Sequence, residues 1–323
     1  MITGIFAGVT WALETVILGL ALGMAPFIST AEGMFLAPFV STFLHDTVSA
    51  LFMIVYNTIR GNFRELVSVF RKKNLIWLVL ASAVGGPVGM SGYVLAVRYM
   101  GSAIGAVASA VYPAVGTILA AVFLKEKVSR SRWIFLILTL AGVLGLSWSP
   151  DLAVENFWLG LLGAMMCACG WGVEAVILAR CFRDGDIRDE IALTVRQSVS
   201  ALIYGTVLMP LLGGWPFTAG LVTGGNGRLI GTVGAAAVCA SVSYLLYYRT
   251  IAKLGASKAM ALNITYTAWA IVFTVLICRD FSLLNPMTLI CAGVVVFCGI
   301  CAAGDLKEIF GRNKSDTHTQ EVL

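Results

Sequence analysis

A tryptophan and a glutamate occur three residues apart at two places in this chain, both within apolar sequence. The first pair is Trp11 and Glu14 in "TWALETVILG", and the second is Trp171 and Glu174 in "GWGVEAVILA". Residues three apart lie on one face of a helix. An indole ring attracts a cation through its quadrupole, and a carboxylate adds negative charge. Two such faces brought together predict a cage for an organic cation. A quaternary ammonium suits it because that group has no hydrogen-bond donors.

Further aromatic residues occupy matched positions in the two halves of the sequence. Tyr112 and Tyr266 coincide when "YMGSAIGAVASAVYP" is laid over "KLGASKAMALNITYT", and Tyr93 matches Tyr247. Trp269 lies about one turn beyond Tyr266. We include Tyr112, Tyr266, Tyr247 and Trp269 in the predicted binding site. Packing against lipid or against another helix is the alternative for each of them.

Two more polar residues, His45 and Asp46, lie inside an apolar run and are also predicted site residues. A charge at the centre of a bilayer costs at least ~2.5–3.5 kcal/mol, so such residues are usually functional. Adjacent residues point to different helix faces, so one of the two is enough to line a cavity. Arg196 is expected either to snorkel to the cytoplasmic surface or to pair with a charge. Snorkelling would leave the interior carboxylates without a fixed cation. The alternative for Glu14 and Glu174 is a protonated carboxyl bonded between helices.

The composition identifies the surroundings as lipid. The chain has 323 residues, of which 59% are hydrophobic and 12% charged, with a mean hydropathy of +0.90. Soluble domains carry about 25% charged residues. The formal charge of +5 comes from basic residues scattered between apolar runs, so we expect no nucleic-acid partner. The eight cysteines are expected to pack as small apolar residues.

Ten apolar runs approach the roughly 20 residues that a helix needs to span a bilayer. Backbone groups in lipid must be hydrogen-bonded internally, so each run is expected to be a helix. The predicted spans are residues 3–25, 34–57, 75–97, 102–123, 133–149, 157–179, 191–213, 229–251, 258–278 and 286–304. We therefore predict an all-α protein that crosses the bacterial plasma or inner membrane ten times.

The basic residues predict the orientation in the membrane. With the N-terminus in the cytoplasm, the cytoplasmic segments hold 18 Lys and Arg residues and the opposite ends hold three. Cytoplasmic loops carry the excess of Lys and Arg. Both termini, including the polar tail at 305–323, are therefore predicted to be cytoplasmic.

The matched strings predict an internal repeat. Residues 1–150 and 151–304 each hold five predicted helices. Because five is odd, the second copy is inverted relative to the first, about a pseudo-two-fold axis in the membrane plane. This 5+5 inverted repeat is expected to bring the two Trp-x-x-Glu faces together near the midplane. The match is unequal at one point, because Asp46 corresponds to Gln197 in "RQSVSAL".

The segment "YPAVGTILAAVFLKEKVS", with Pro113 and Glu126, resembles the drug/metabolite transporter superfamily in its ten-helix EamA form. The resemblance covers about residues 3–304. The second copy departs from the pattern, with Thr267 and Asp280 at the corresponding positions. The resemblance implies secondary transport of small metabolites by alternating access. The Trp-x-x-Glu pairs are also similar to the choline-uptake branch of this superfamily.

We therefore predict a secondary transporter for a small organic cation, with choline or a related quaternary ammonium as the cargo. The alternative is a proton-coupled exporter of cationic drugs or of another small metabolite, because "ALETVILG" is similar to the first helix of small multidrug-resistance proteins. A non-transporting membrane sensor or assembly partner is a third possibility. We expect no enzyme activity, cofactor or metal site. Direction, coupling to protons and assembly as a homodimer stay open.

Overall fold

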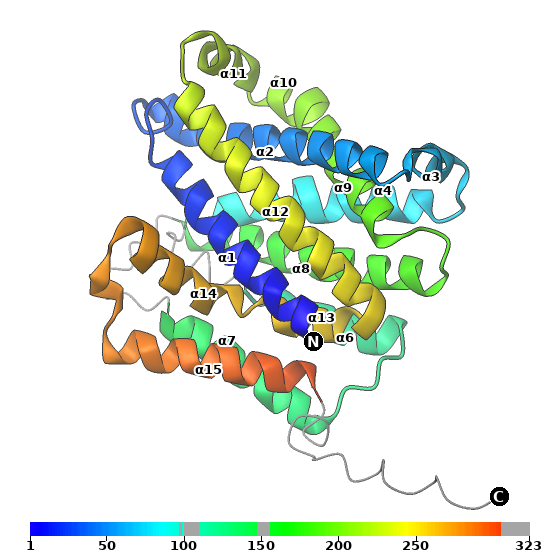
Figure 1. Cartoon of the computed structure of the whole chain (residues 1–323). Coiled ribbons are helices and arrows are strands. Elements are labelled where there is room, and N and C mark those ends of the chain that lie inside the picture. The colour runs from blue at the N-terminus through cyan, green and yellow to red at the C-terminus, as the bar shows by residue number, and fades with distance from the viewer. Residues whose placement is uncertain (97–98, 100–109, 147–155, 305–323) are drawn as a thin grey trace, which may run out of the picture.

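The structure is a computed structural model that describes residues 1–96, 99, 110–146 and 156–304, and these ranges contain helices and no strand (Figure 1). The predicted tail at 305–323 lies outside the described residues. The α-helices are α1 (Ile2–Leu22), α2 (Ala31–Ile59), α3 (Phe63–Ser68), α4 (Leu75–Ala83), α6 (Tyr112–Phe123), α7 (Arg130–Leu146), α8 (Phe157–Arg183), α9 (Asp189–Ile203), α10 (Met209–Leu211), α11 (Gly214–Thr223), α12 (Gly227–Leu254), α13 (Ala256–Asn263), α14 (Tyr266–Phe273) and α15 (Pro286–Ala303). Shorter segments are η1 (Val69–Arg71), η2 (Val84–Val88), η3 (Tyr204–Leu208), η4 (Thr274–Cys278) and η5 (Phe281–Leu283).

In the part of the chain that the structure describes, eight segments are long and apolar enough to cross a bilayer. They are Ile2–Leu22, Ala31–Ile59, Leu75–Ala96, Phe157–Arg183, Asp189–Leu211, Gly227–Leu254, Ala256–Cys278 and Pro286–Ala303. Each of them matches one of the ten predicted spans. The other two predicted spans, 102–123 and 133–149, overlap the shorter helices α6 and α7 and extend beyond the described residues. The chain is an all-helical, multi-pass membrane protein.

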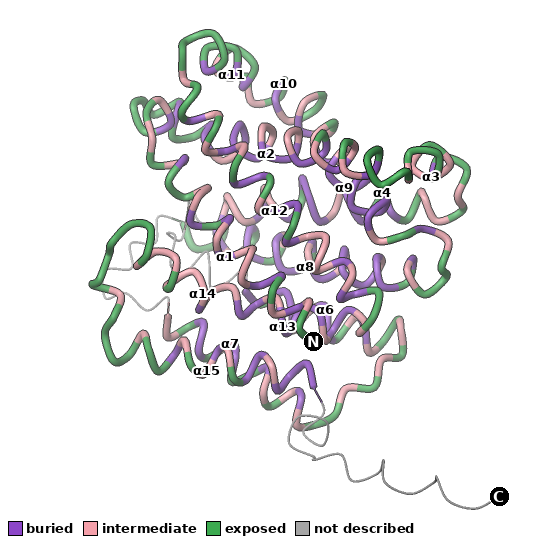
Figure 2. The backbone as a smooth tube through the Cα atoms, in the orientation of Figure 1, coloured by how far each residue is buried: buried purple, intermediate pink, exposed green. Residues whose placement is uncertain are grey.

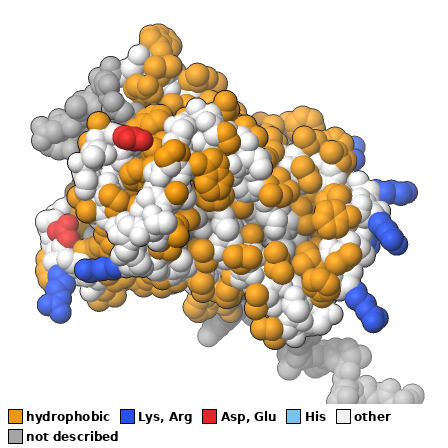
Figure 3. Space-filling model, turned by 90° about the horizontal axis from the view of Figure 1, so that it is seen from above, with side chains coloured by type: hydrophobic (Ala, Val, Ile, Leu, Met, Phe, Trp, Pro, Cys, Tyr) orange, Lys and Arg blue, Asp and Glu red, His pale blue; other side chains and the backbone are white. Residues whose placement is uncertain are grey.

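The outer surface is apolar, as a lipid environment requires. Large side chains such as Leu51 on α2, Ile137 on α7 and Ile290 on α15 are exposed. Figure 3 shows hydrophobic side chains across much of one face, with Lys and Arg side chains at its edges. Figure 2 shows exposed residues along the outside of the helices and buried residues on their inward sides. Exposed apolar area on this scale marks a surface that lipid covers.

Polar side chains fix where three of the long helices begin. The Thr30 hydroxyl accepts a hydrogen bond from Gly33 N (2.9 Å) at the start of α2. Asn156 accepts one from Leu159 N (3.1 Å) before α8, and Asn285 one from Thr288 N (2.9 Å) before α15. Each pairs a backbone N–H that the helix leaves without an internal partner. These residues therefore locate the ends of the spans.

A glycine-rich irregularity lets α4 approach its neighbours closely. The helix changes to the π-helical η2 at Val84–Val88, which contains Pro87. A β-carbon on Gly85 would overlap the Glu174 carboxylate of α8, and one on Gly86 would lie 2.5 Å from the Ser200 hydroxyl of α9. The glycines are therefore needed for packing against α8 and α9, which places Glu174 deep in the protein.

The first helix of each sequence half packs mainly on the other half. Helix α1 lies along α12 and also contacts α13 and α14, as Figure 1 shows for α1 and α12. Helix α8 packs on α4, η2 and α6, which belong to residues 1–150. The last helices of the two halves, α7 and α15, lie side by side (Figure 1). Residues 1–150 and 151–304 are thus joined along an extensive seam.

Glu126, in the segment after α6, binds the start of α13 across this seam. Its carboxylate accepts hydrogen bonds from Ala256 N (3.1 Å), Ser257 N (3.3 Å) and the Ser257 hydroxyl (2.5 Å). Arg183, at the end of α8, pairs with the same carboxylate at 3.3 Å. Gly255 has a φ of +86°, and a β-carbon there would lie 2.5 Å from Glu126 Oε1. A carboxylate at a helix N-terminus is favoured by the helix dipole.

Replacing Glu126 by alanine should destabilise the protein by about 1–3 kcal/mol, because it leaves the first amides of α13 unpaired. Thermal unfolding of the purified protein in detergent measures the effect as a lower midpoint. The control is Glu32→Ala, because Glu32 is exposed in the first turn of α2. Equal midpoints for the two variants would show that the bond across the seam contributes no stability.

Candidate binding site

One cavity at the seam contains most of the predicted aromatic residues. Its lining residues are Trp11, Tyr112, Trp171, Glu174, Ala175, Ser243, Tyr244, Tyr247, Asn263 and Tyr266. They come from α1, α6, α8, α12, α13 and α14, so both halves of the sequence contribute. The cavity volume is about 40 Å³. One water needs at least roughly 10–15 Å³, so in this conformation the cavity has room for a few atoms, and a metabolite requires its walls to move apart.

Each of the two indoles packs against tyrosines from the other half of the sequence. The Trp11 ring lies 4.8 Å from Tyr244 and 6.4 Å from Tyr266, edge to face in both cases. The Trp171 ring lies 5.6 Å from Tyr112, edge to face, and 6.1 Å from Tyr93, where the rings are stacked. The two sides of the cavity therefore have the same construction, with one indole held among tyrosines of the opposite half.

The position of Trp171 is fixed by the η2 irregularity. Its indole N–H donates to Gly85 O at 3.0 Å. A β-carbon on Gly89 would lie 2.8 Å from the indole ring. The indole nitrogen is therefore occupied by the backbone, and the ring face is the part of Trp171 that a ligand can use.

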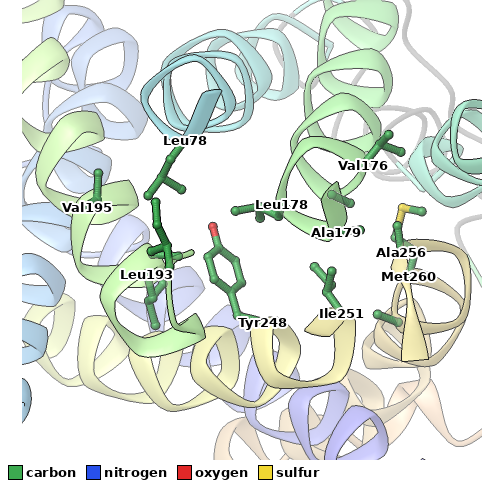
Figure 4. Packing of buried hydrophobic residues seen from close by; sticks show 14 of the residues in the cluster. Leu78, Val176, Leu178, Ala179, Leu193, Val195, Tyr248, Ile251, Ala256 and Met260 are labelled. Carbon is green, nitrogen blue, oxygen red and sulfur yellow. The ribbon is translucent and has the colours of Figure 1, made fainter. Parts of the chain in front are cut away.

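Glu174 lines the cavity, and its carboxylate is hydrogen-bonded by two side chains that do not line it. Its Oε1 accepts hydrogen bonds from Arg196 Nε and from the Tyr248 hydroxyl, each at 3.1 Å. Figure 4 shows the Tyr248 ring standing between Leu193 and Ile251 in the apolar core. The carboxylate is 7% exposed, so its charge is balanced by fixed partners within the membrane-spanning core.

Arg196 does not snorkel to the surface, which corrects one of the two roles expected for it. The residue is 4% exposed and lies deep among the helices. Besides Glu174, its guanidinium lies 3.7 Å from Asp46 and donates to Gln197 Oε1 at 2.8 Å. It also lies 4.8 Å from the centre of the Tyr244 ring, in cation–π contact. Burial leaves a charge-pairing role, because an unpaired guanidinium in this position would be very costly.

Asp46 and His45 lie beside the cavity and do not line it. The Asp46 carboxylate accepts a hydrogen bond from the Ser200 hydroxyl at 2.6 Å. The neighbouring His45 Nδ1 is 2.9 Å from Asp46 Oδ1, so the two adjacent side chains turn towards each other. His45 Nε2 is buried without a hydrogen-bond partner among the described residues. Both residues belong to a polar network that adjoins the binding cavity.

Glu14 also belongs to this network and is absent from the cavity wall. It is 4% exposed, it accepts a hydrogen bond from the Thr15 hydroxyl at 3.3 Å, and its Oε1 lies 3.7 Å from His45 Nε2. Trp11 lines the cavity from the same helix. The two Trp-x-x-Glu motifs are therefore not equivalent in this structure: both tryptophans line the cavity, but Glu174 is the one glutamate that does.

The acidic side chains of this core outnumber the basic ones. Three buried carboxylates, Glu14, Asp46 and Glu174, stand against one guanidinium and the His45 imidazole. Even with His45 protonated, three ionised carboxylates leave one negative charge unbalanced. A buried excess of negative charge favours a cationic guest.

Several site residues were not predicted from the sequence, and Trp269 joins Glu14, His45 and Asp46 as predicted residues that do not line the cavity. Tyr244, Ser243 and Asn263 line the cavity. Tyr244 lies one helical turn before Tyr247, so it could have been found from its spacing, whereas Asn263 corresponds to Ser109 in the repeat and has no amide counterpart there. Trp269 is not part of the cavity wall, and its indole nitrogen is buried without a hydrogen-bond partner among the described residues.

Comparison with known proteins supports transport. Residues 1–148 match the EamA-like transporter family. This match covers the first of the two sequence halves and assigns that half to a family of transporters. The chain is therefore a transporter and not an enzyme, as the sequence predicted. A curated relative, Protein LicB of Haemophilus influenzae, is 27% identical over 224 residues, which cover 67% of this chain and 73% of LicB. A crystal structure of another protein shares the fold with a TM-score of 0.69 and 17% identity, covering 94% of this chain and 96% of that one.

Removing the buried guanidinium should destabilise this EamA-like protein severely. Arg196→Gln leaves Glu174 and Asp46 without their cation, which costs about 3–5 kcal/mol for a broken buried pair. Thermal unfolding in detergent should show the loss. The matched control is Arg228→Gln, because Arg228 is exposed.

Adding Glu174→Gln to Arg196→Gln should restore part of the loss, because it removes one of the stranded carboxylates. If Arg196→Gln unfolds at the same temperature as Arg228→Gln, the buried ion pairs are not a structural requirement.

Proposed function

We propose that the protein is a secondary transporter of a small organic cation, with choline or a related quaternary ammonium as its substrate. The observation that carries this proposal is the cavity wall, in which two tryptophans and four tyrosines surround one carboxylate. A quaternary ammonium offers no hydrogen bonds, so it is recognised by aromatic faces and negative charge. The family assignment supports transport, and the aromatic wall supports this class of cargo.

The aromatic faces carry more of this recognition than the carboxylates do. Glu174 already pairs with Arg196, and the guanidinium of Arg196 covers one face of Tyr244. Among the described residues, no Lys or Arg lies over the indole faces of Trp11 and Trp171. Each cation–π contact contributes about 0.5–2 kcal/mol, and several act together around one ammonium group.

The small cavity volume fits an alternating-access cycle. At about 40 Å³ the site is narrower than a quaternary ammonium needs, so the helices that carry the rings have to separate when the substrate enters. Because α1 and α8 each pack on the opposite half, rocking one half against the other moves both indoles relative to the tyrosines. The proposed motion therefore opens and closes the cage itself.

We also propose the ten-span, 5+5 inverted repeat, with residues 1–150 and 151–304 as its halves and both termini cytoplasmic. The exchange of α1 and α8 between the halves and the matched tryptophan–tyrosine contacts support it. The fold shared with a crystal structure over 94% of this chain is consistent with it. In such repeats the substrate site lies at the interface of the two copies near the midplane.

Proton coupling is a second candidate mechanism, and it is favoured by the position of His45. This buried imidazole lies between Asp46 at 2.9 Å and Glu14 at 3.7 Å, next to the cavity. Flux in proteoliposomes separates the two mechanisms. Accumulation that follows the membrane potential alone, ~2.3 kcal/mol per charge per 100 mV, indicates uniport. Accumulation that persists at zero potential under a pH gradient indicates proton coupling.

Trp11→Ala and Trp171→Ala should each weaken choline binding by about 0.5–2 kcal/mol, which is roughly 2- to 30-fold in Kd. Isothermal titration of the purified protein measures the change. The control is Trp158→Ala, because Trp158 is exposed at the start of α8. If both cavity variants bind choline as tightly as the control does, the aromatic cage is wrong and the tryptophans serve helix packing.

Glu174→Gln should weaken choline binding by at least about tenfold, whereas Glu14→Gln should change it by less than about threefold. The reason is that Glu174 lines the cavity and Glu14 does not. The same titration measures both, and the unfolding midpoint of each variant controls for loss of fold. Equal losses of affinity would place Glu14 at the substrate and contradict the observed asymmetry.

A further inference from the structure

Asn263 lines the cavity and has one side-chain atom that lacks a hydrogen-bond partner within the described parts of the chain. It is the last residue of α13, at the break before α14, and its Nδ2 donates to the Tyr112 hydroxyl at 3.1 Å. Its Oδ1 is buried and has no hydrogen-bond partner among the described residues. Of the buried oxygen and nitrogen atoms without a partner in those parts of the chain, this is the one that belongs to a cavity-lining residue.

Two other polar side chains of the wall, Glu174 and Ser243, already have hydrogen-bond partners in the protein. The Glu174 carboxylate accepts from Arg196 and Tyr248. The Ser243 hydroxyl donates to Ala7 O at 2.7 Å. Buried carbonyl groups are nearly always hydrogen-bonded in folded proteins, and an unpaired one is costly. A ligand that brings a hydroxyl donor to Asn263 Oδ1 therefore removes a cost that a ligand without one leaves in place.

We propose that Asn263 recognises a hydroxyl group on the substrate by a hydrogen bond, so that the site selects a hydroxyalkyl quaternary ammonium. This inference rests on the proposed function, since it takes the aromatic cage as the site of the cationic group. The hydroxyl of the side arm donates to Asn263 Oδ1 while the ammonium group contacts the rings. A carboxylate on the arm is disfavoured, because it would place one acceptor against another and would add negative charge near Glu174.

Tyr112 has the positioning role in this arrangement. Its hydroxyl accepts the hydrogen bond of Asn263 Nδ2, which leaves Oδ1 as the amide atom without a partner among the described residues, and its ring also packs on Trp171 at 5.6 Å. An amide with the opposite orientation would present an NH₂ group to the cavity and would prefer a carboxylate-bearing ligand. The order of affinity among ligands therefore reports which amide atom faces the substrate.

The test is a titration of the purified full-length protein with three ligands that share the quaternary ammonium group. Choline carries a hydroxyl, ethyltrimethylammonium carries none, and glycine betaine carries a carboxylate. We expect choline to bind about 5- to 100-fold more tightly than ethyltrimethylammonium, because the analogue leaves the buried carbonyl unpaired. Glycine betaine should bind most weakly of the three.

Two variants test whether Asn263 causes the preference for choline over ethyltrimethylammonium. In Asn263→Leu, which has a similar shape but no polar atom, choline and ethyltrimethylammonium should bind with equal affinity. In Tyr112→Phe, which keeps the ring, the preference for choline should shrink while ethyltrimethylammonium still binds. Retained binding of ethyltrimethylammonium shows in each case that the variant is folded and that its cage is intact.

The outcomes separate this inference from the proposed function. Equal affinities in the wild-type protein, a preference for glycine betaine, or a choline preference that survives in Asn263→Leu would each overturn the role of Asn263 and leave the cation site standing. Absence of binding by all three ligands to a folded wild-type protein would instead overturn the proposed function.

Discussion

The structure depends on one buried guanidinium. Arg196 joins Glu174 of α8 and Asp46 of α2 to its own helix α9, and it lies over the Tyr244 ring of α12. In the interior of a membrane protein an unpaired charge is costly, so these groups stabilise one another. The packing follows from this requirement, because the glycines of η2 allow Glu174 to approach α4 closely enough to meet Arg196. The aromatic cavity lies directly beside this ion pair.

The seam between the sequence halves brings structural support and binding together. At one end, Glu126 binds the start of α13 through backbone amides. The same helix ends at Asn263, whose side chain reaches the cavity. Trp11 of the first half packs on tyrosines of the second half, and Trp171 of the second half packs on tyrosines of the first. A relative movement of the halves therefore changes the shape of the cavity and the contacts of Glu126 with α13 at the same time, as the proposed alternating access requires.

The sequence predicted the class of fold and much of the cavity, for physical reasons that apply locally. Apolar runs of bilayer length become helices whatever their neighbours are, and the doubled motif located both Trp11 and Trp171. Charge pairing was one of the two roles expected for Arg196, but its partners Glu174 and Asp46 could not be predicted, because they depend on which helices pack together. The separation of Glu14 from the cavity has the same cause, since a three-residue spacing fixes a helix face but not the partner of that face. Asn263 was not predicted because the repeat matches it with Ser109 and not with a second amide, so the residue type does not recur.

The central claim is that a quaternary ammonium binds among the rings of Trp11, Trp171, Tyr244 and Tyr266. The most direct measurement is anomalous diffraction from crystals grown with arsenocholine, in which arsenic replaces the ammonium nitrogen. The account predicts a single strong arsenic peak within about 6 Å of the centres of at least two of these rings. A peak elsewhere, at the lipid-facing surface or in the polar network around His45, would contradict it.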